Sequence, residues 1–501
     1  MYLIQTLFFV LCTIVATLFI KWCKMKSYWI KKGIPQGTVH PIFGSMTFLQ
    51  KINPCVWLAD MYKQYPFPYV GIWVFWRPGL IVNCPKLARN ILVKDSDVFR
   101  DRLLGTGKKD ELGTLNIFTV NDPLWSNIRR HLTPVFTSAK LKGWQELYRS
   151  KSKDLVERIT SDNEKGISSS LRPLYADYAT DIIGESAFGI KCEATKNNSG
   201  SLRAMTKEFE KYSTFRGIQW SSIFFFPEMA DFLGFTFWPR HTMGYFRKIF
   251  GMIVAERGGY DQKTDGKRDL MDCLLKMKQD AMAENQNLDE VVVISNAMIF
   301  LQGGYDTSST ALTYLTYELA HHPHYQQTIY EELIEAKRIN EGNDWGPNDF
   351  TELPYFNAVI KEMFRKYPIM GWLDRIASKD YTVDENLTIS AGTVVYINAM
   401  GMHHDPKLFP NPEEFRAERF LPENEKNIIP YTYLPFGEGP RSCIGKRFGM
   451  YSLRYALAAL ITNFTLKPFP NSPKPNEVPV QSKGLFFSPG ISLTVDFVPR
   501  K

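Results

Sequence analysis

The sequence predicts a mainly α-helical protein with a small β component, held at a membrane by a single N-terminal transmembrane helix. Three observations predict this fold class. The chain opens on a run of 19 uncharged residues after Met1, helical periodicity dominates the rest of the chain, and no Ser/Gly-rich linker or internal repeat divides the 501 residues. An apolar content of 44% is ordinary for a packed core. We therefore expect one large domain behind the anchor.

The membrane anchor is predicted at residues 2–20, because about 20 apolar residues span a hydrocarbon core of ~30 Å as a helix. A cleaved signal peptide is the alternative, but the apolar run exceeds the usual ~7–15 residues and shows no small-residue cleavage site. A basic linker containing Pro and Gly follows at residues 21–42. By the positive-inside rule, the domain of residues 43–501 is then cytosolic.

Charge and cysteine usage narrow the class of protein. The net charge of +8 is a mild excess without Lys/Arg tracts, which argues against a nucleic-acid partner. Seven cysteines are scattered singly, which argues against a disulfide framework or a CxxC metal site and favours a reducing compartment. In a cytosolic domain we expect no glycosylation at the three N-glycosylation sequons, which begin at Asn197, Asn386 and Asn463.

The β component is predicted in short segments. Residues 69–75 and 80–85 are β-branched or aromatic runs separated by the turn signal WRPG, so they are expected to form a hairpin. Two more strands are expected at residues 381–383 and 393–398. The aromatic stretch at residues 219–240 is interrupted by Pro and Gly, and two interpretations stay open: buried core, or a surface patch that dips into the bilayer.

A long helix is predicted over residues 287–322. Asn287 and Asp289 are its cap candidates, since such side chains accept from the first free N–H groups of a helix. Pro323 cannot continue a helix and is expected to end it. At 1.5 Å per residue, this helix is about 50 Å long.

The middle of this helix carries adjacent glycines, Gly303 and Gly304, each of which costs about 1 kcal/mol relative to alanine. Two missing side chains let a flat or bulky group approach the backbone. Asp306 and Thr307 then supply an acid and a hydroxyl beside that gap. The alternative is a plain helix crossing with a capping-type Asp and Thr.

Two further groups of charged residues are spaced for contact. Glu362 and Arg365 are separated by i, i+3 on one helix face, and with Arg419 they are expected to form a partly buried cluster that fixes a loop; a solvated pair is the alternative. Trp125 and Arg129 are separated by i, i+4, so the indole N–H and the guanidinium are able to converge on one anion, unless they simply stack.

The segment LPFGEGPRSCIGKRFGM, residues 434–450, places Cys443 directly before a predicted amphipathic helix. The free N–H groups and dipole of a helix N-terminus lower the pKa of a thiol, so a thiolate is predicted here, with an inert buried thiol as the alternative. A cysteine nucleophile would need a His/Asn arrangement that the sequence does not suggest. The surrounding residues suit a thiolate under an iron porphyrin: bending glycines, an apolar screen and a carboxylate-binding arginine, at Gly437, Gly439, Gly445, Phe436 and Arg441.

Together these residues resemble the cytochrome P450 superfamily, the haem-thiolate monooxygenases. The pattern F-x-x-G-x-R-x-C-x-G is complete at residues 436–445. The family's E-x-x-R falls on residues 362–365, its W-x-x-x-R on residues 125–129 and its oxygen-activating G-G-x-D-T on residues 303–307, all in the family's order. Its P-E-R-F becomes AERF, with Ala417 in place of a rigid proline. Finer features resemble the microsomal clan of insect detoxifying and vertebrate drug-metabolising forms, the insect group being nearer.

The resemblance implies the cytochrome P450 fold, a helical haem-binding domain with small β-sheets, and haem b as cofactor. Cys443 would be the metal ligand, whose electron donation favours O–O cleavage. Asp306 and Thr307 would be the catalytic pair that relays protons to O2, the co-substrate. The other cofactor-binding residues would be Trp125, Arg129, Arg375, Phe436, Gly439, Arg441 and Gly445.

Electrons are expected from a partner, because the chain holds no flavin or dinucleotide motif. The resemblance implies NADPH-cytochrome P450 reductase, so that NADPH is used indirectly, with cytochrome b5 as a further donor and the endoplasmic reticulum membrane as the location. A basic face on the cysteine side of the haem would receive an acidic partner, with solvated surface charge as the alternative for each of Arg130, Lys140, Lys142, Lys446 and Arg447.

The substrate is expected to be a small lipophilic molecule, since the pocket candidates are mainly apolar or aromatic. Chosen by position, and each with core as its alternative, they are Ile117, Phe118, Phe300, Gly303, Gly304, Ile369, Met370 and Phe486. The leading hypothesis is oxidation of xenobiotics such as plant toxins or insecticides. The alternatives are hormone or pheromone metabolism, and a haem protein that binds ligands or passes electrons without oxidising anything.

Overall fold

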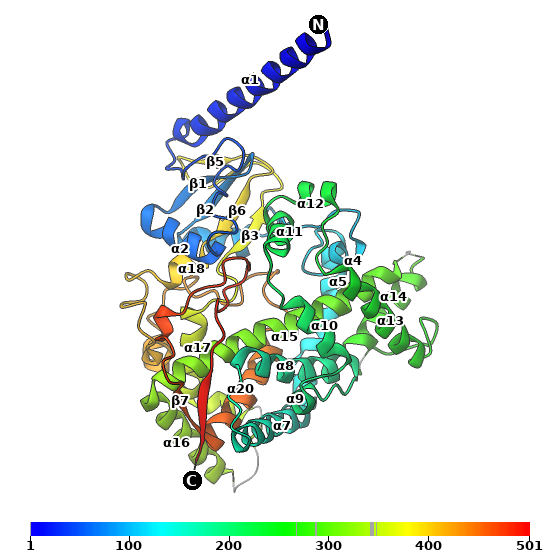
Figure 1. Ribbon diagram of the computed structural model, residues 1–501, viewed down its shortest axis with the longest axis vertical. Helices are drawn as coiled ribbons and strands as arrows, with labels where there is room; N and C mark the ends of the chain where they lie inside the picture. Colours follow the sequence, from blue (N-terminus) through cyan, green and yellow to red (C-terminus); the bar gives the residue numbers. More distant parts are fainter. Residues whose placement is uncertain (1, 267, 286–287, 341–344, 347, 501) are drawn as a thin grey trace.

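Helix α1 (Tyr2–Lys31) carries the apolar N-terminal run and projects away from the rest of the molecule (Figure 1). It continues past residue 20, so the first part of the linker predicted at residues 21–42 is helical. Among the described residues it is the one helix long and apolar enough to cross a membrane. The computed structural model describes residues 2–266, 268–285, 288–340, 345–346 and 348–500.

The last turns of α1 dock on the main sheet. Met25 and Trp29 are buried, and Nε1 of Trp29 donates to the carbonyl oxygen of Ile72 at 3.1 Å. Gly71 lies directly against the indole, because a Cβ there would come within 2.3 Å of Trp29 Cγ. Packed side chains therefore hold the anchor to the body, in addition to the peptide connection.

The main sheet has the strand order β1-β2-β6-β3, formed by β1 (Tyr69–Val74), β2 (Arg77–Val82), β6 (Val394–Ile397) and β3 (Leu373–Ile376). β1 and β2 are the predicted antiparallel hairpin. The predicted turn WRPG is displaced, however, because Arg77, Pro78 and Gly79 already belong to β2 and the chain turns at Phe75 and Trp76. β6 joins β2 only from Gly79 onward, so its ladder does not need the N–H that Pro78 lacks.

Two small sheets complete the β component: β4 (Tyr381–Thr382) with β5 (Thr388–Ile389), and β7 (Phe464–Pro468) with β8 (Val495–Pro499). The strands predicted at residues 381–383 and 393–398 correspond to β4 and β6. β3, β5, β7 and β8 were not predicted. Each is five residues or shorter, too short for alternation to stand out from the flanking sequence.

Most of the remaining chain is helical, which confirms the mainly α fold class. Helix α15 (Glu290–His321) crosses the middle of the body (Figure 1). Asp289 is its N-cap, accepting from the Val291 N–H at 2.9 Å, and Pro323 starts the next helix; the other cap candidate, Asn287, lies outside the described residues. Further helices are α2 (Pro54–Gln64), α3 (Pro85–Arg89), α4 (Glu111–Thr114), α5 (Leu124–Leu132), α6 (Ser138–Gly143), α7 (Gln145–Glu164), α8 (Leu171–Phe188), α9 (Ala194–Asn197), α10 (Ser201–Phe209), α11 (Thr214–Phe225), α12 (Pro227–Leu233), α13 (Arg240–Glu256), α14 (Leu270–Ala283), α16 (Pro323–Ile339), α17 (Pro354–Lys366), α18 (Ala399–His403), α19 (Pro422–Glu425) and α20 (Lys446–Asn463).

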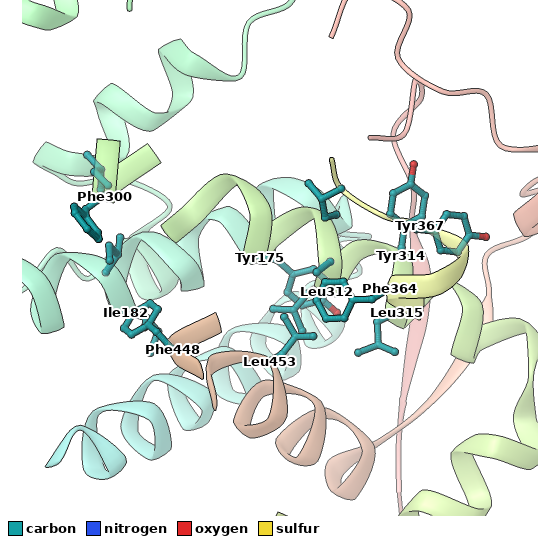
Figure 2. Close-up of a cluster of buried hydrophobic side chains, with 14 of the residues drawn as sticks. Tyr175, Ile182, Phe300, Leu312, Tyr314, Leu315, Phe364, Tyr367, Phe448 and Leu453 are labelled. Atoms are coloured by element: carbon teal, nitrogen blue, oxygen red, sulfur yellow. The ribbon is translucent and has the colours of Figure 1, made fainter. Parts of the chain in front are cut away.

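The hydrophobic core gathers around α15. Figure 2 shows side chains of α8, α15, α17 and α20 in one buried cluster, among them Ile182, Leu312 and Phe448. The axes of α8 and α15 approach closely at Gly304, where a Cβ would lie 2.8 Å from the Ile183 side chain. This cluster fixes α15 against the helix that follows the Cys443 loop.

The aromatic stretch at residues 219–240 divides between the two interpretations left open. The end of α11 and the segment after α12 face inward, with Phe224 and Phe237 buried. The far face of α12 is open, and Phe232 is 79% exposed. α12 lies toward the end of the molecule from which α1 projects (Figure 1). One part of the stretch is therefore core, and the other is an exposed apolar patch.

Candidate functional site

The loop before α20 holds Cys443 in a fixed geometry. Gly437 and Gly439 adopt positive φ values of 67° and 76°, a backbone region that L side chains rarely enter. Gly439 also packs on the backbone, because a Cβ there would lie 1.9 Å from the carbonyl oxygen of Leu92. The Cys443 N–H donates to the carbonyl oxygen of Phe436 at 2.9 Å and closes the loop.

The sulfur of Cys443 lies just ahead of α20, as predicted, but its acidity differs from the prediction. Burial raises the pKa of the thiol, and the N–H groups of Gly445 and Lys446 and the charge of Arg129 oppose this only in part. The residue keeps an exposed surface although many atoms of the body surround its sulfur. For the free thiol the direction of the pKa shift is therefore opposite to the predicted lowering, and a bound metal ion would favour the thiolate, because it deprotonates a coordinating thiol.

An arginine cluster lies beside this loop. Arg441 donates to the carbonyl oxygen of Arg100 at 2.5 Å, and its guanidinium lies 4.3 Å from the centroid of the Trp125 ring. Arg375 donates to the carbonyl oxygen of Asp374 at 2.7 Å. Arg102, which sequence reasoning did not single out, pairs with the Asp374 carboxylate at 2.6 Å.

The electrostatics of this cluster favour an anion. Burial and repulsion from Arg102 lower the pKa of Arg441 to about 9 and that of Arg375 to about 10. Burial also lowers the pKa of Arg129. Asp374 already neutralises Arg102, so buried positive charge remains in excess, a costly arrangement that a bound carboxylate would relieve. The two propionates of a haem fit this donor set.

A second buried cluster supports the Cys443 loop from behind. Arg365 pairs with Glu362 through two hydrogen bonds of 2.8 and 2.9 Å, and both side chains are fully buried. Arg419 contacts the same carboxylate at 3.4 Å, so the structure brings the three residues together. His403, for which the sequence motifs predicted no role, links this cluster to the loop. Its Nδ1 contacts the Arg365 carbonyl at 3.0 Å, and its Nε2 accepts from the Leu434 N–H at 2.8 Å.

One face of α15 opens in the middle of an otherwise buried helix. Gly303 and Thr307 are exposed, Ile299 is partly exposed, and no atom lies within 4 Å of a Cβ placed on Gly303. The Thr307 hydroxyl donates to the Gly303 carbonyl at 2.8 Å. The i, i+4, i+8 spacing places Ile299 on this face, a signal that sequence reasoning did not use.

The two adjacent glycines thus have different surroundings. Gly304 faces Ile183 and permits the crossing of α8 and α15, so the prediction that it lines the substrate pocket is replaced by the crossing alternative. Phe300, labelled in the buried cluster of Figure 2, is 9% exposed, and its ring stacks on that of Phe136 with the centroids 5.5 Å apart, which favours the core alternative over a place in the pocket. A helix buried on nearly all sides gives no apolar stripe from which to predict the open face.

Two of the remaining pocket candidates, Phe118 and Phe486, lie near one aromatic group. The ring of Phe224 is 6.0 Å from Phe118 and 6.4 Å from Phe486, and Trp220 is 6.2 Å from Phe486. Phe224 and Trp220 belong to α11 and were not predicted. The backbone of the Phe486 loop is held at Ile369, whose carbonyl accepts from the Phe487 N–H at 2.8 Å. Ile117 and Met370 are partly buried at the edges of the core.

The basic residues predicted for a partner lie on α5, α6 and α20, helices that flank the Cys443 loop. Four of the five are exposed, namely Arg130, Lys142, Lys446 and Arg447, whereas Lys140 is partly buried. Arg447 lies 3.4 Å from the Ser138 hydroxyl, which ties α20 to α6. These charges are therefore available at the surface beside the sulfur.

Comparison with known proteins gives a consistent result. A family model described as Cytochrome P450 matches residues 34–495. The chain is 32% identical to cytochrome P450 6k1 of Blattella germanica, over 97% of this chain and 96% of that protein. It is 33% identical to cytochrome P450 6j1 of the same species, over 93% and 92%. It is 31% identical to cytochrome P450 6a2 of Drosophila melanogaster, over 87% and 89%.

Proposed function

The chain belongs to the cytochrome P450 family and is a haem-using monooxygenase, and from this premise we propose that it oxidises small lipophilic xenobiotics at the endoplasmic reticulum membrane. The observation that carries the substrate class is the aromatic group of Phe118, Phe224 and Phe486. A site lined by these aromatic rings favours apolar molecules with few polar groups. The sequence resemblance to insect detoxifying forms supports the same class.

The residues around Cys443 would hold the haem. Cys443 would bind the iron, while Arg441, Arg375 and Arg129 would pair with the propionates, with Trp125 beneath Arg441. When bound, the haem supplies the iron that activates O2 and carries out the oxidation. The protein would fix the sulfur through the glycine turns and compensate the carboxylates with its excess of buried positive charge.

Asp306 and Thr307 would move protons toward the open face of α15. The Thr307 hydroxyl donates a hydrogen bond to the Gly303 carbonyl oxygen at 2.8 Å, so the hydroxyl oxygen is left free to accept a hydrogen bond from another donor. Asp306 is the neighbouring acid, held at 2.8 Å by Arg172 of α8. An acid next to a hydroxyl, at an exposed turn in the middle of a largely buried helix, is the arrangement that a proton path needs.

Two surfaces would set the partners. The exposed charges of Arg130, Lys142, Lys446 and Arg447 would receive an acidic electron donor, the NADPH-dependent reductase, with cytochrome b5 as a second donor. At the end of the molecule where α1 leaves, the exposed apolar side chains of α12, led by Phe232, would dip into the lipid. The catalytic domain would thus lie on the cytosolic face of the membrane.

Product analysis tests the proposed substrate class. Purified full-length protein, reductase and NADPH would be incubated with a panel of lipophilic plant compounds and insecticides and with a panel of steroids, and products would be identified by mass spectrometry. We expect oxygenated products that depend on NADPH, mainly from the first panel. Turnover confined to steroids would refute the xenobiotic assignment and favour hormone metabolism.

A further inference from the structure

The carboxylate of Asp306 is held by contacts that extend beyond α15. Its Oδ1 accepts from Nη2 of Arg172 at 2.8 Å, and the two side chains are only 18% and 17% exposed. The same Nη2 donates to the hydroxyl of Tyr212 at 3.2 Å, and the guanidinium lies 5.5 Å from the Tyr212 ring centroid. Arg172 is therefore shared between the acid of the proton path and a tyrosine that follows α10.

Tyr212 in turn touches the loop of residues 481–488. Its hydroxyl lies 3.5 Å from the Ser488 hydroxyl, and a Cβ on Gly484 would lie 3.1 Å from the Tyr212 ring. The amide of Asn53 fixes this loop by donating to three of its carbonyl oxygens at 2.9 to 3.1 Å. The loop carries Phe486, which meets the α11 aromatics that we assign to the substrate pocket.

A second connection joins the same parts of the chain. Arg172 lies in the first turn of α8, and the residue before it, Leu171, donates its N–H to the Leu493 carbonyl at 2.8 Å. The Ser170 and Ser492 hydroxyls are 2.5 Å apart. The start of α8 is thus attached to the chain just beyond the Phe486 loop, so a shift of that loop is transmitted to Arg172 by backbone as well as by side-chain contacts.

The Arg172 guanidinium is incompletely satisfied. Its Nε is buried and has no hydrogen-bond partner among the described residues. A buried donor without a partner loses the hydrogen bond that it makes to water in the unfolded chain and is costly for that reason. Other positions of the Arg172 side chain, in which Nε gains a partner and the contact with Asp306 is lost, therefore lie closer in free energy to the observed position than they would if every N–H of the guanidinium were hydrogen-bonded.

From these contacts we propose that Arg172 and Tyr212 are positioning residues for Asp306, which restrain its carboxylate and tie that restraint to the substrate loop at Phe486. The ion pair occupies Oδ1 of Asp306 and fixes the direction in which the carboxylate points. A substrate that moves Phe486 shifts Tyr212, loosens the ion pair and frees Asp306 to relay protons. Proton delivery thereby depends on whether the pocket is filled. This inference rests on the proposed role of Asp306.

The test measures the share of NADPH electrons that ends in product, and its solvent deuterium isotope effect, with full-length enzyme and reductase in vesicles. We expect Tyr212→Phe, which keeps the ring and removes the hydroxyl, to change this share by at least about twofold, the smallest effect typical of residues in one hydrogen-bond network. Arg172→Gln should change it in the same direction. The control Tyr245→Phe, at an exposed tyrosine of α13, should change neither quantity.

The link to the pocket has its own measurement. Phe486→Leu should alter the solvent isotope effect in the wild-type background and have no such effect in the Tyr212→Phe background. Asp306→Asn is the reference: if it leaves the share and the isotope effect unchanged, the proton role of Asp306 fails. If Asp306→Asn changes the share and the isotope effect while Tyr212→Phe changes neither, the positioning role is overturned and the proposed function stands. The same conclusion follows if the effects of Phe486→Leu and Tyr212→Phe add independently. Should Arg172→Gln fail to fold, Tyr212→Phe alone decides.

Discussion

Replacing Gly439 with alanine tests the geometry that holds Cys443. The left-handed backbone at this position costs an L residue about 1–2 kcal/mol. The added Cβ would also lie 1.9 Å from the Leu92 carbonyl oxygen, and no rotamer relieves an overlap between a Cβ and a backbone atom. Moving the backbone adds about 1–3 kcal/mol, as overpacking does. We therefore expect the substitution to destabilise the loop by about 2–5 kcal/mol.

Two other glycines provide matched controls. Gly437 also has a positive φ, but the closest contact of its Cβ would be the flexible end of Leu373 at 3.3 Å, with the backbone of Ser442 at an ordinary 3.9 Å, so alanine should cost about 1–2 kcal/mol. Gly449 lies within α20 with no atom near its Cβ position, so alanine there should stabilise the helix by up to about 1 kcal/mol. The size of each effect follows from the surroundings of each glycine.

The assay is the haem content per polypeptide of the purified full-length variants, together with the midpoint of thermal unfolding. We expect both quantities to decrease in the order Gly449→Ala, wild type, Gly437→Ala and Gly439→Ala, with little haem retained by the last. Wild-type haem content in Gly439→Ala, or a larger loss in Gly437→Ala than in Gly439→Ala, would refute the reasoning.

Three further predictions concern other parts of the site. Thr307→Ala should lower the share of electrons that ends in product several-fold and release peroxide instead, with haem content unchanged; an unchanged share would refute the proton role. Burial lowers the pKa of His403 to about 3 from 6.5. Below pH 6.5 the unfolded state therefore binds a proton that the folded state does not, and the stability that the neutral imidazole contributes above pH 6.5 is lost progressively as the pH falls. Between pH 6.5 and 5.5 urea unfolding should show a loss of about 1 kcal/mol in the wild type that His403→Gln lacks, and equal slopes would contradict this. Arg365→Lys should cost about 3–5 kcal/mol and abolish haem-loaded protein, whereas the exposed Arg338→Lys should not; wild-type yield of Arg365→Lys would contradict the role of the buried pair.

Much of the site could be predicted because its motifs are local. The glycines, Arg441 and Cys443 stand within ten residues, and turn chemistry and helix periodicity place the thiol before α20. Glu362 and Arg365 share one helix face, so their pairing needed only the helix repeat. Local spacing therefore determines the contacts that lie within one element or one turn.

Partners from distant segments could not be predicted in this way. Arg102, His403 and Arg172 reach the site from elements far from it in sequence, and no spacing rule connects them. The pKa of Cys443 depends on how many atoms surround it, which a helix terminus alone does not determine. Phe300 is a pocket candidate by its position on the long helix alone, and because α15 is apolar on nearly all sides, only the packing shows which face is open.

The central claim is that the sulfur of Cys443 would bind the iron of a haem as a thiolate. The most direct test is the absorption spectrum of the ferrous carbonyl complex of the full-length protein, recorded beside that of Cys443→Ser. We predict the red-shifted band of an iron-bound thiolate in the wild type and its loss in the variant. A wild-type spectrum without that band, or a variant that keeps it, would contradict the assignment.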